Sequence, residues 1–181
     1  MKPLKEYRIP FLGLKLGKHE YEFHLTQKFF EVFEYSEIEI ADINVSLQLE
    51  KQQNMMVAHF QLKGTVQVAC DHCGDEFQQP LKATHSLLIK FGESTSEPDD
   101  EVLILGPQEY ELDISHFLYE YAHLAMPARH VHPSDSQCNQ QAVQALNRYK
   151  VDTTASTQWA ELKNLNYEDP EDNPDFDQEE E

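Results

Sequence analysis

The sequence predicts an α+β fold: an antiparallel β meander with a Cys-x-x-Cys turn, packed by a few helices and followed by a disordered acidic C-terminal tail. Hydrophobic residues alternate with polar ones through most of residues 38–91, and short turn sequences separate the runs. Such alternation is typical of antiparallel strands with one face on the core. After residue 113 the hydrophobic period becomes helical. The chain of 181 residues is long enough for one domain with a substantial core.

The chain before residue 38 is predicted to be mainly extended. Hydrophobic residues alternate with glycine, lysine or other polar residues from Leu12 to Leu16 and again from Tyr21 to Leu25, as in half-buried strands. Thr26 is a candidate cap for a short helix that carries Phe29, Phe30 and Phe33.

The meander itself begins with a change of parity. Ile38 and Ile40 occupy even positions, whereas the hydrophobic residues of the segment 43–49 occupy odd ones. A strand that changes the face it buries needs a bulge or a bend, so we expect one near Ala41 and Asp42.

Three further strands follow, separated by turns at Gln52–Asn54, at Lys63–Gly64 and at the cysteine pair. We expect these strands at Met56–Leu62, at Val66–Cys70 and, as a long strand with one apolar face, at Phe77–Phe91.

The second half of the chain is predicted to be helical. A polar, acidic loop is expected at residues 92–100, followed by a short strand at 102–105 and a helix that Asp113 caps and Pro127 ends. Weaker helical patterns lie at residues 142–149 and 159–165. The predicted buried stripe of the first helix consists of Ile114, Phe117, Leu118, Tyr121, Leu124 and Ala125.

Charge is distributed unevenly along this acidic chain, whose formal net charge is −19. Residues 168–181 hold nine acidic residues and no basic one, and so polar a tail is not expected to fold alone. The acidic excess repels nucleic acid, so a general basic nucleic-acid-binding domain is not indicated, and the one basic cluster lies at the N-terminus. This basic cluster consists of Lys2, Lys5, Arg8, Lys15 and Lys18.

The residues that could carry chemistry are three cysteines and their neighbouring histidines. Cys70 and Cys73 flank a predicted strand end, and Gly74 follows them, which is the spacing with which two thiolates hold one Zn²⁺ from a tight turn. Cys138 is a third sulfur, and the same loop offers His130 or His132 as a fourth ligand. A structural zinc site is therefore predicted, without a catalytic site.

Two other interpretations of the cysteine pair remain open. The thiols could simply pack in the turn, or they could form a redox pair. Redox chemistry of the thioredoxin type needs the first cysteine at a helix N-terminus, whereas the flanks here alternate like strands. Among the other histidines, His85 is expected in the core, and His59, His116 and His123 on polar, solvated faces.

Four blocks of the sequence occur in a familiar order: Val68–Gly74 with Phe77, Glu111–Ile114 with Glu120 and Leu124–Pro127, His132–Cys138, and Trp159–Leu165. In series they resemble the YceD family, the large ribosomal RNA subunit accumulation proteins, also known as domain of unknown function 177. The resemblance extends over roughly residues 40–165. The chain lacks the extra cysteines that many relatives carry in the third block, and His132 is the better match to the family's histidine, with His130 second.

The resemblance gives a YceD-like domain at residues 38–165. Charge and composition add an N-terminal segment with the basic cluster at residues 1–37 and a disordered acidic tail at 166–181. The resemblance also implies a non-enzymatic factor that supports 23S rRNA accumulation and large-subunit assembly, by associating with precursor rRNA. Contact with RNA is expected to start at the basic cluster, because phosphate is repelled elsewhere. In the alternative, the protein is an acidic adaptor that holds a basic ribosomal protein before its incorporation.

We expect no small-molecule substrate and no membrane. No apolar run approaches the roughly 18 residues of a membrane span, and the first ten residues lack the apolar segment of a signal peptide. A cytoplasmic location is therefore expected.

Overall fold

The computed structural model describes residues 4–92, 96–99 and 102–150. The chain divides into two compact units, residues 1–143 and 144–181. The sheets and the first two helices belong to the first unit, and the predicted third helix and the acidic tail lie outside the described residues. No helix among the described residues is both long and apolar enough to cross a membrane.

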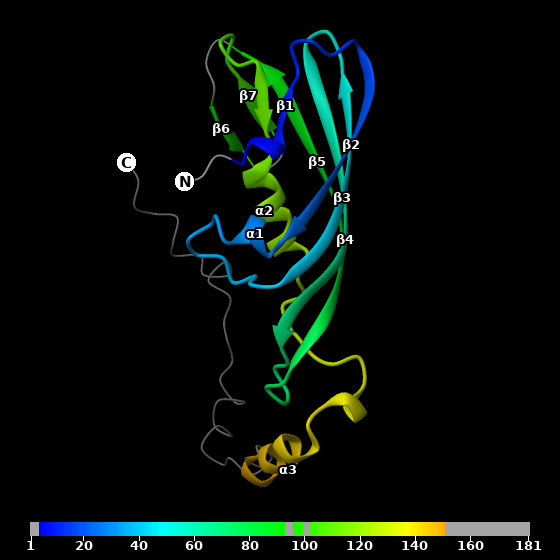
Figure 1. Cartoon of the computed structure of the whole chain (residues 1–181), viewed down its shortest axis with the longest axis vertical. Coiled ribbons are helices and arrows are strands. Elements are labelled where there is room, and N and C mark those ends of the chain that lie inside the picture. The colour runs from blue at the N-terminus through cyan, green and yellow to red at the C-terminus, as the bar shows by residue number, and fades with distance from the viewer. Residues whose placement is uncertain (1–3, 93–95, 100–101, 151–181) are drawn as a thin grey trace, which may run out of the picture. The chain divides into compact units, whose positions relative to one another are not determined.

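A six-stranded, mostly antiparallel sheet dominates the first unit (Figure 1). The meander expected from the alternation is confirmed, and β7 adds to β5 in parallel. β6 forms a strand where a loop was predicted, so that expectation is wrong; its polar sequence carries no alternation. In spatial order the strands are β2 (Gly17–Thr26), β3 (Ala41–Lys51), β4 (Met55–Ala69), β5 (Glu76–Phe91), β7 (Val102–Leu105) and β6 (Ser96–Asp99).

The turn predicted at Lys63–Gly64 is wrong, because β4 runs through both residues without interruption. The even positions of the strand stay apolar on either side of Gly64, as they do in one continuous strand. Glycine is needed here because β3 lies unusually close: a Cβ added at Gly64 would lie 2.0 Å from the carbonyl oxygen of Asp42. The glycine marks a close backbone approach and not a turn.

The bulge or bend expected near Ala41 is present as a bend at Ile40. Ile38 is buried and Ile40 exposed, and both precede β3, which begins at Ala41 and alternates regularly from there without a bulge. The parity change in the sequence therefore marks the start of the strand.

A second, two-stranded sheet pairs β1 (Arg8–Pro10) with β8 (Glu111–Asp113). Arg8 donates to the carboxylate of Asp113 at 3.2 Å. The strand predicted at residues 12–16 does not form; the Lys51 ammonium instead donates to three carbonyl oxygens of this loop, those of Phe11, Leu12 and Leu14.

Two helices lie on one face of the large sheet, as Figure 1 shows. The short helix α1 (Gln27–Phe30) follows Thr26 as predicted, although the Thr26 side chain makes no cap hydrogen bond. α2 (Ser115–Leu124) has Ile114 and not the predicted Asp113 as its N-cap residue, although the Asp113 carboxylate accepts from the backbone N–H of Ser115 at 3.0 Å.

The buried stripe of α2 differs from the prediction at its end. Leu124 is 72% exposed, whereas Ala122 is buried. His123, expected in solvent, is half-buried with its ring 4.2 Å from that of Tyr119. A third helix, α3 (Gln140–Tyr149), confirms the expected helix near residues 142–149; the amide oxygen of Asn139 accepts from the backbone N–H of Gln141 and begins it.

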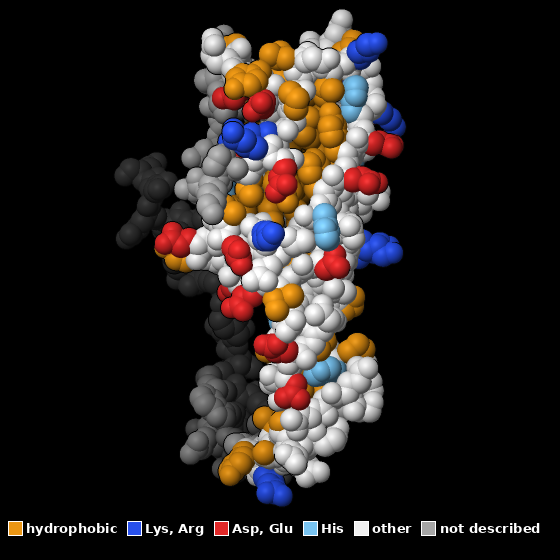
Figure 2. Space-filling model, in the orientation of Figure 1, with side chains coloured by type: hydrophobic (Ala, Val, Ile, Leu, Met, Phe, Trp, Pro, Cys, Tyr) orange, Lys and Arg blue, Asp and Glu red, His pale blue; other side chains and the backbone are white. Residues whose placement is uncertain are grey.

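The hydrophobic core lies between the helix-covered face of the sheet, here called the inner face, and α1, α2 and β1. Phe60 of β4 contacts Tyr121 of α2 with ring centroids 5.2 Å apart. In Figure 2 hydrophobic side chains gather over the part of the molecule where Figure 1 labels β1, β5 and β2, and charged groups lie around them. The opposite face, here called the outer face, carries the polar residues of β2–β5.

The hairpin of β4 and β5 extends beyond its neighbours. Ala41, the first residue of β3, pairs with Val66, so β4 continues past β3 as a two-strand ribbon with β5 (Figure 1). The tip of this hairpin, residues 67–80, carries the Cys-x-x-Cys turn.

Candidate metal centre

The turn at the tip is closed by its own backbone. The N–H of Cys70 donates to the carbonyl of Asp75 at 2.9 Å, and that of Gly74 donates to the carbonyl of Cys70 at 2.8 Å. Gly74 has a φ of +80°, a conformation that glycine adopts without steric cost. This closure turns the Cys70 and Cys73 side chains toward one another.

A pair of hydrogen bonds holds the loop after α2 against the turn. The N–H of Asp71 donates to the carbonyl of His130 at 2.7 Å, and the N–H of His130 donates to the Asp71 carboxylate at 2.7 Å. The reciprocal bonds fix residues 128–138, here called the ligand loop, in register with the hairpin tip. His132 and Cys138 are brought to the turn in this way.

Four ligand atoms meet between the turn and the ligand loop. The Sγ atoms of Cys70, Cys73 and Cys138 and a ring nitrogen of His132 all lie within 4.8 Å of one another, so the group could hold a metal ion. The His132 Nδ1 is 3.7 Å from the Cys73 sulfur and 3.5 Å from the Cys138 sulfur. In a tetrahedral zinc site, bond lengths of about 2.3 Å to sulfur and 2.0 Å to nitrogen place a sulfur and a nitrogen ligand about 3.5 Å apart.

The electrostatics of the site favour a cation. Burial raises the pKa of Cys70, but backbone N–H groups of His72, His132 and Cys73 donate to its sulfur and lower the pKa to about 6. Burial and the two neighbouring thiols raise the pKa of Cys138 to about 11. A divalent cation among the sulfurs stabilises all three thiolates, so binding releases protons.

The burial of the sulfurs is a second sign of a ligand set. Cys70 is 2% and Cys138 5% exposed, yet neither belongs to the main hydrophobic core. Within residues 67–80 and 127–138, as far as their side chains are described, these two are the only buried residues. The cysteines are thus buried mainly by each other and by the surrounding turns.

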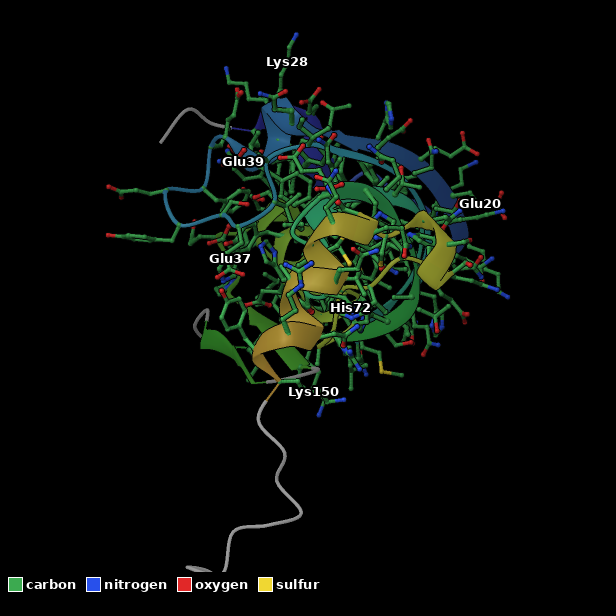
Figure 3. All side chains as sticks on the ribbon, turned by 90° about the horizontal axis from the view of Figure 1, so that it is seen from below. Glu20, Lys28, Glu37, Glu39, His72 and Lys150 are labelled. Carbon is green, nitrogen blue, oxygen red and sulfur yellow. The ribbon has the colours of Figure 1, made fainter. Side chains whose placement is uncertain are left out.

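Neighbouring aromatic rings complete the surroundings. The His132 ring packs on Phe77 with centroids 4.6 Å apart, which fixes its orientation toward the sulfurs. His72, between the two cysteines of the turn, places its Nδ1 3.8 Å from the Cys138 sulfur. Figure 3, seen from below, looks onto this end, with His72 near the middle and Glu37 and Glu39 pointing outward.

The predicted ligand residues thus lie together, and one alternative does not. Cys70, Cys73, Cys138 and His132 form the group, whereas the His130 ring is outside it and contributes through its backbone. The contacts of His72 and Asp71 were not predicted. The only sequence signal for them was their place inside the Cys-x-x-Cys turn, which does not show what lies across the turn.

The remaining candidates have structural roles. His85 is half-buried, and its ring stacks on Tyr121 at 4.2 Å, as expected for a core histidine. His59 is exposed and bonds Ser86 at 2.9 Å. Across the described parts of the chain, no second group of three or more such ligands is close enough to hold a metal ion.

The N-terminal basic cluster is partly neutralised. Arg8 pairs with Asp113 at 3.2 Å and with Glu111 at 4.0 Å, while Lys5, Lys15 and Lys18 are exposed. Lys2 lies outside the described residues.

Residues 58–166 match the model of the family described as large ribosomal RNA subunit accumulation protein YceD. The chain belongs to the YceD family. The family's name gives its members a role in the accumulation of large-subunit ribosomal RNA. No curated protein and no solved structure matches the chain.

The matched range spans both parts of the metal centre. It begins within β4 and contains the Cys-x-x-Cys turn, α2 and the ligand loop, whereas β2 and β3 precede it. In this chain the Cys-x-x-Cys turn and the ligand loop therefore both lie within the region that defines the YceD family.

Proposed function

We propose that this YceD-family protein is a non-enzymatic cytoplasmic factor that supports 23S rRNA accumulation and assembly of the large ribosomal subunit by associating with precursor rRNA. The family match over residues 58–166 carries the proposal. A scaffold role agrees with the site, because the cluster of cysteine and histidine ligands found among the described residues lies between two segments of the chain and would join them.

The metal in this proposal is a structural Zn²⁺ bound by Cys70, Cys73, Cys138 and His132. Three sulfurs and one imidazole are a ligand set of structural zinc sites, and four protein ligands leave no position open for substrate. The zinc would join the hairpin tip to the ligand loop. The redox interpretation has little support, because Cys70 follows a strand and not a helix N-terminus.

The test is to deplete the protein in its own cells and to purify a tagged copy from them. We expect less mature 23S rRNA relative to the small-subunit rRNA, and precursor 23S rRNA enriched among the co-purified RNAs. Normal rRNA levels and ribosome profiles after complete depletion would contradict the proposal.

A specific observation supports a second candidate, the adaptor for a basic ribosomal protein. A hollow of about 440 Å³ beside the turn has the acidic residues Glu37, Glu39, Asp71 and Glu76 in its lining, with Ile40 and Met126 as apolar members. Such walls suit a Lys- or Arg-bearing segment. The same purification distinguishes the two, because an adaptor retains a ribosomal protein after ribonuclease treatment.

A further inference from the structure

The hairpin of β4 and β5 is free of acidic residues over most of its length. Residues 51–70 and 77–92 contain no Asp or Glu, in a chain with 33 acidic residues. The same segments contain Lys51, Lys63, Lys82 and Lys90. Charge is thus segregated: in the β4–β5 hairpin, the longest of the sheet, the charged side chains along the strands are lysines, apart from Glu76 at the tip.

Three of these lysines lie on the outer face of the sheet. Lys63 and Lys82 are direct cross-strand partners and both are exposed. Like charges directly opposite each other destabilise a sheet, so the pair costs stability unless an anion lies between them. Lys90 lies eight residues beyond Lys82 on the same face, about 26 Å along an extended strand.

These ammonium groups are available to a ligand. In the described part of the chain, the basic side chains within 4.0 Å of a carboxylate are Arg8, His24 and His116, and the three lysines are not among them. Lys51, by contrast, is used to hold the loop after β1.

The surface between the lysines is polar and hollowed. A hollow of about 490 Å³ is lined on β4 and β5 by His59, Gln61, Thr84 and Ser86. Hydroxyl, amide and imidazole groups bind phosphate and ribose oxygens well. Across the hollow, β2 contributes Glu20 and Glu22, which repel an anion from that side.

We infer that RNA binds along the outer face of β4 and β5, with Lys63 and Lys82 at the centre of the contact and Lys90 at one end. The inference rests on the proposed function, since it locates the surface by which the protein associates with precursor rRNA. Charge complementarity favours this face over the other surfaces of the acidic chain, because here the RNA phosphates meet a strip of the sheet without carboxylates. The contact is sequence-independent, since lysines and a polar hollow recognise the backbone.

The experiment measures binding of the purified full chain to an in vitro transcript of precursor 23S rRNA at several salt concentrations. The outer-face variant carries Lys63→Gln, Lys82→Gln and Lys90→Gln. The matched control loses the same charge off this face, through Lys5→Gln, Lys15→Gln and Lys28→Gln. All six lysines are exposed.

We expect the outer-face variant to bind roughly tenfold more weakly and its log–log salt slope to fall by about 2 to 3 units, at about 0.7 to 0.9 per lost contact. The control should keep the wild-type slope within about one unit. The melting temperature of the outer-face variant should stay at or above that of the wild type, because the opposed charges of Lys63 and Lys82 are gone.

The outcomes separate the inference from the function on which it rests. Loss of binding in the control with a normal outer-face variant would overturn the inference and leave the proposed function intact. No binding by the wild type, with a basic ribosomal protein retained instead, would overturn both. If the outer-face variant fails to fold, ultraviolet crosslinking of the wild type decides: crosslinks in β4 and β5 support the inference, and crosslinks confined to residues 4–28 overturn it.

A change of opposite sign gives a second readout. Glu20→Gln with Glu22→Gln should raise affinity for the same transcript several-fold, because it removes two carboxylates facing the RNA across the hollow. Unchanged or weaker binding would count against RNA on this face.

Discussion

The body of the sheet and the tip of the β4–β5 hairpin are stabilised by different interactions. In the body, β3 and β4 bury an apolar side chain at nearly every second position, and residues such as Leu49 and Phe60 are fully buried. In the tip and the ligand loop, the buried residues among the described side chains are two cysteines. Apolar burial therefore stabilises the body, whereas the tip relies on its hydrogen bonds to the ligand loop and, in our proposal, on the bound metal.

The difference predicts different responses to the same perturbation. A large side chain removed from the body costs the transfer free energy and leaves a cavity, with or without metal. A ligand removed from the tip leaves unpaired thiolates and few apolar contacts to hold the ligand loop. The two regions should therefore be separable by mutation.

The largest effect is expected from Cys73→Ser. Structural zinc can contribute on the order of 10 kcal/mol to folding, comparable with the roughly 5–15 kcal/mol stability of a whole domain. The variant should lose its zinc and melt at a much lower temperature, and the amides of Asp71 and His130 should lose protection from hydrogen exchange first. Calorimetry and hydrogen exchange measure both, and a metal-free variant that melts like the wild type would refute the structural role.

A smaller loss is expected from Phe60→Ala, which acts on the body. Phe60 is fully buried and packs on Tyr121, so the variant should lose about 3–5 kcal/mol of unfolding free energy. Its zinc content should stay at one per folded chain, because Phe60 lies in the first half of β4, far along the strand from the Cys-x-x-Cys turn. Denaturant titration with elemental analysis checks this, and loss of metal from folded Phe60→Ala would show that the two regions are not independent.

The two histidines of the ligand loop offer a matched pair. His132→Ala removes a proposed ligand and should weaken zinc binding by at least about tenfold. His130→Ala keeps the backbone bonds to Asp71 and should leave affinity nearly unchanged. Competition with a chelating dye compares them, and the reverse ranking would make His130 the ligand.

The smallest effect is expected from removal of residues 167–181. This segment contains Tyr167 and Phe176 as its only large apolar residues, too few to offset the entropy of ordering it. Thermal unfolding should be unchanged. A clear fall in melting temperature would mean that the acidic tail contributes to folding.

Sequence reasoning predicted the body well, because alternation records burial directly. It failed where one residue has two structural uses. Glycine occurs both in turns and where two backbones approach closely. The sequence around Gly64 did not separate these two uses, although the unbroken parity across β4 favoured a continuous strand. β1 and β8 are only three residues long, too short for alternation to predict.

For the candidate metal centre, the sequence predicted which residues are the ligands but not the contacts that bring them together. The spacing of Cys70 and Cys73 indicates a zinc turn, and the family resemblance favours His132 over His130. The reciprocal hydrogen bonds between Asp71 and His130 connect positions 59 residues apart, and a periodic pattern in the sequence cannot predict such a pair. The outer-face lysines were missed because they are spread over two strands and become neighbours only through register.

X-ray absorption at the zinc edge tests the central claim most directly, on full-length protein purified without chelator. We expect about one zinc per chain, with about three sulfur neighbours at about 2.3 Å and one nitrogen at about 2.0–2.1 Å. Protein that is folded and free of zinc, or a spectrum dominated by oxygen neighbours, would contradict the assignment of Cys70, Cys73, Cys138 and His132 as its ligands.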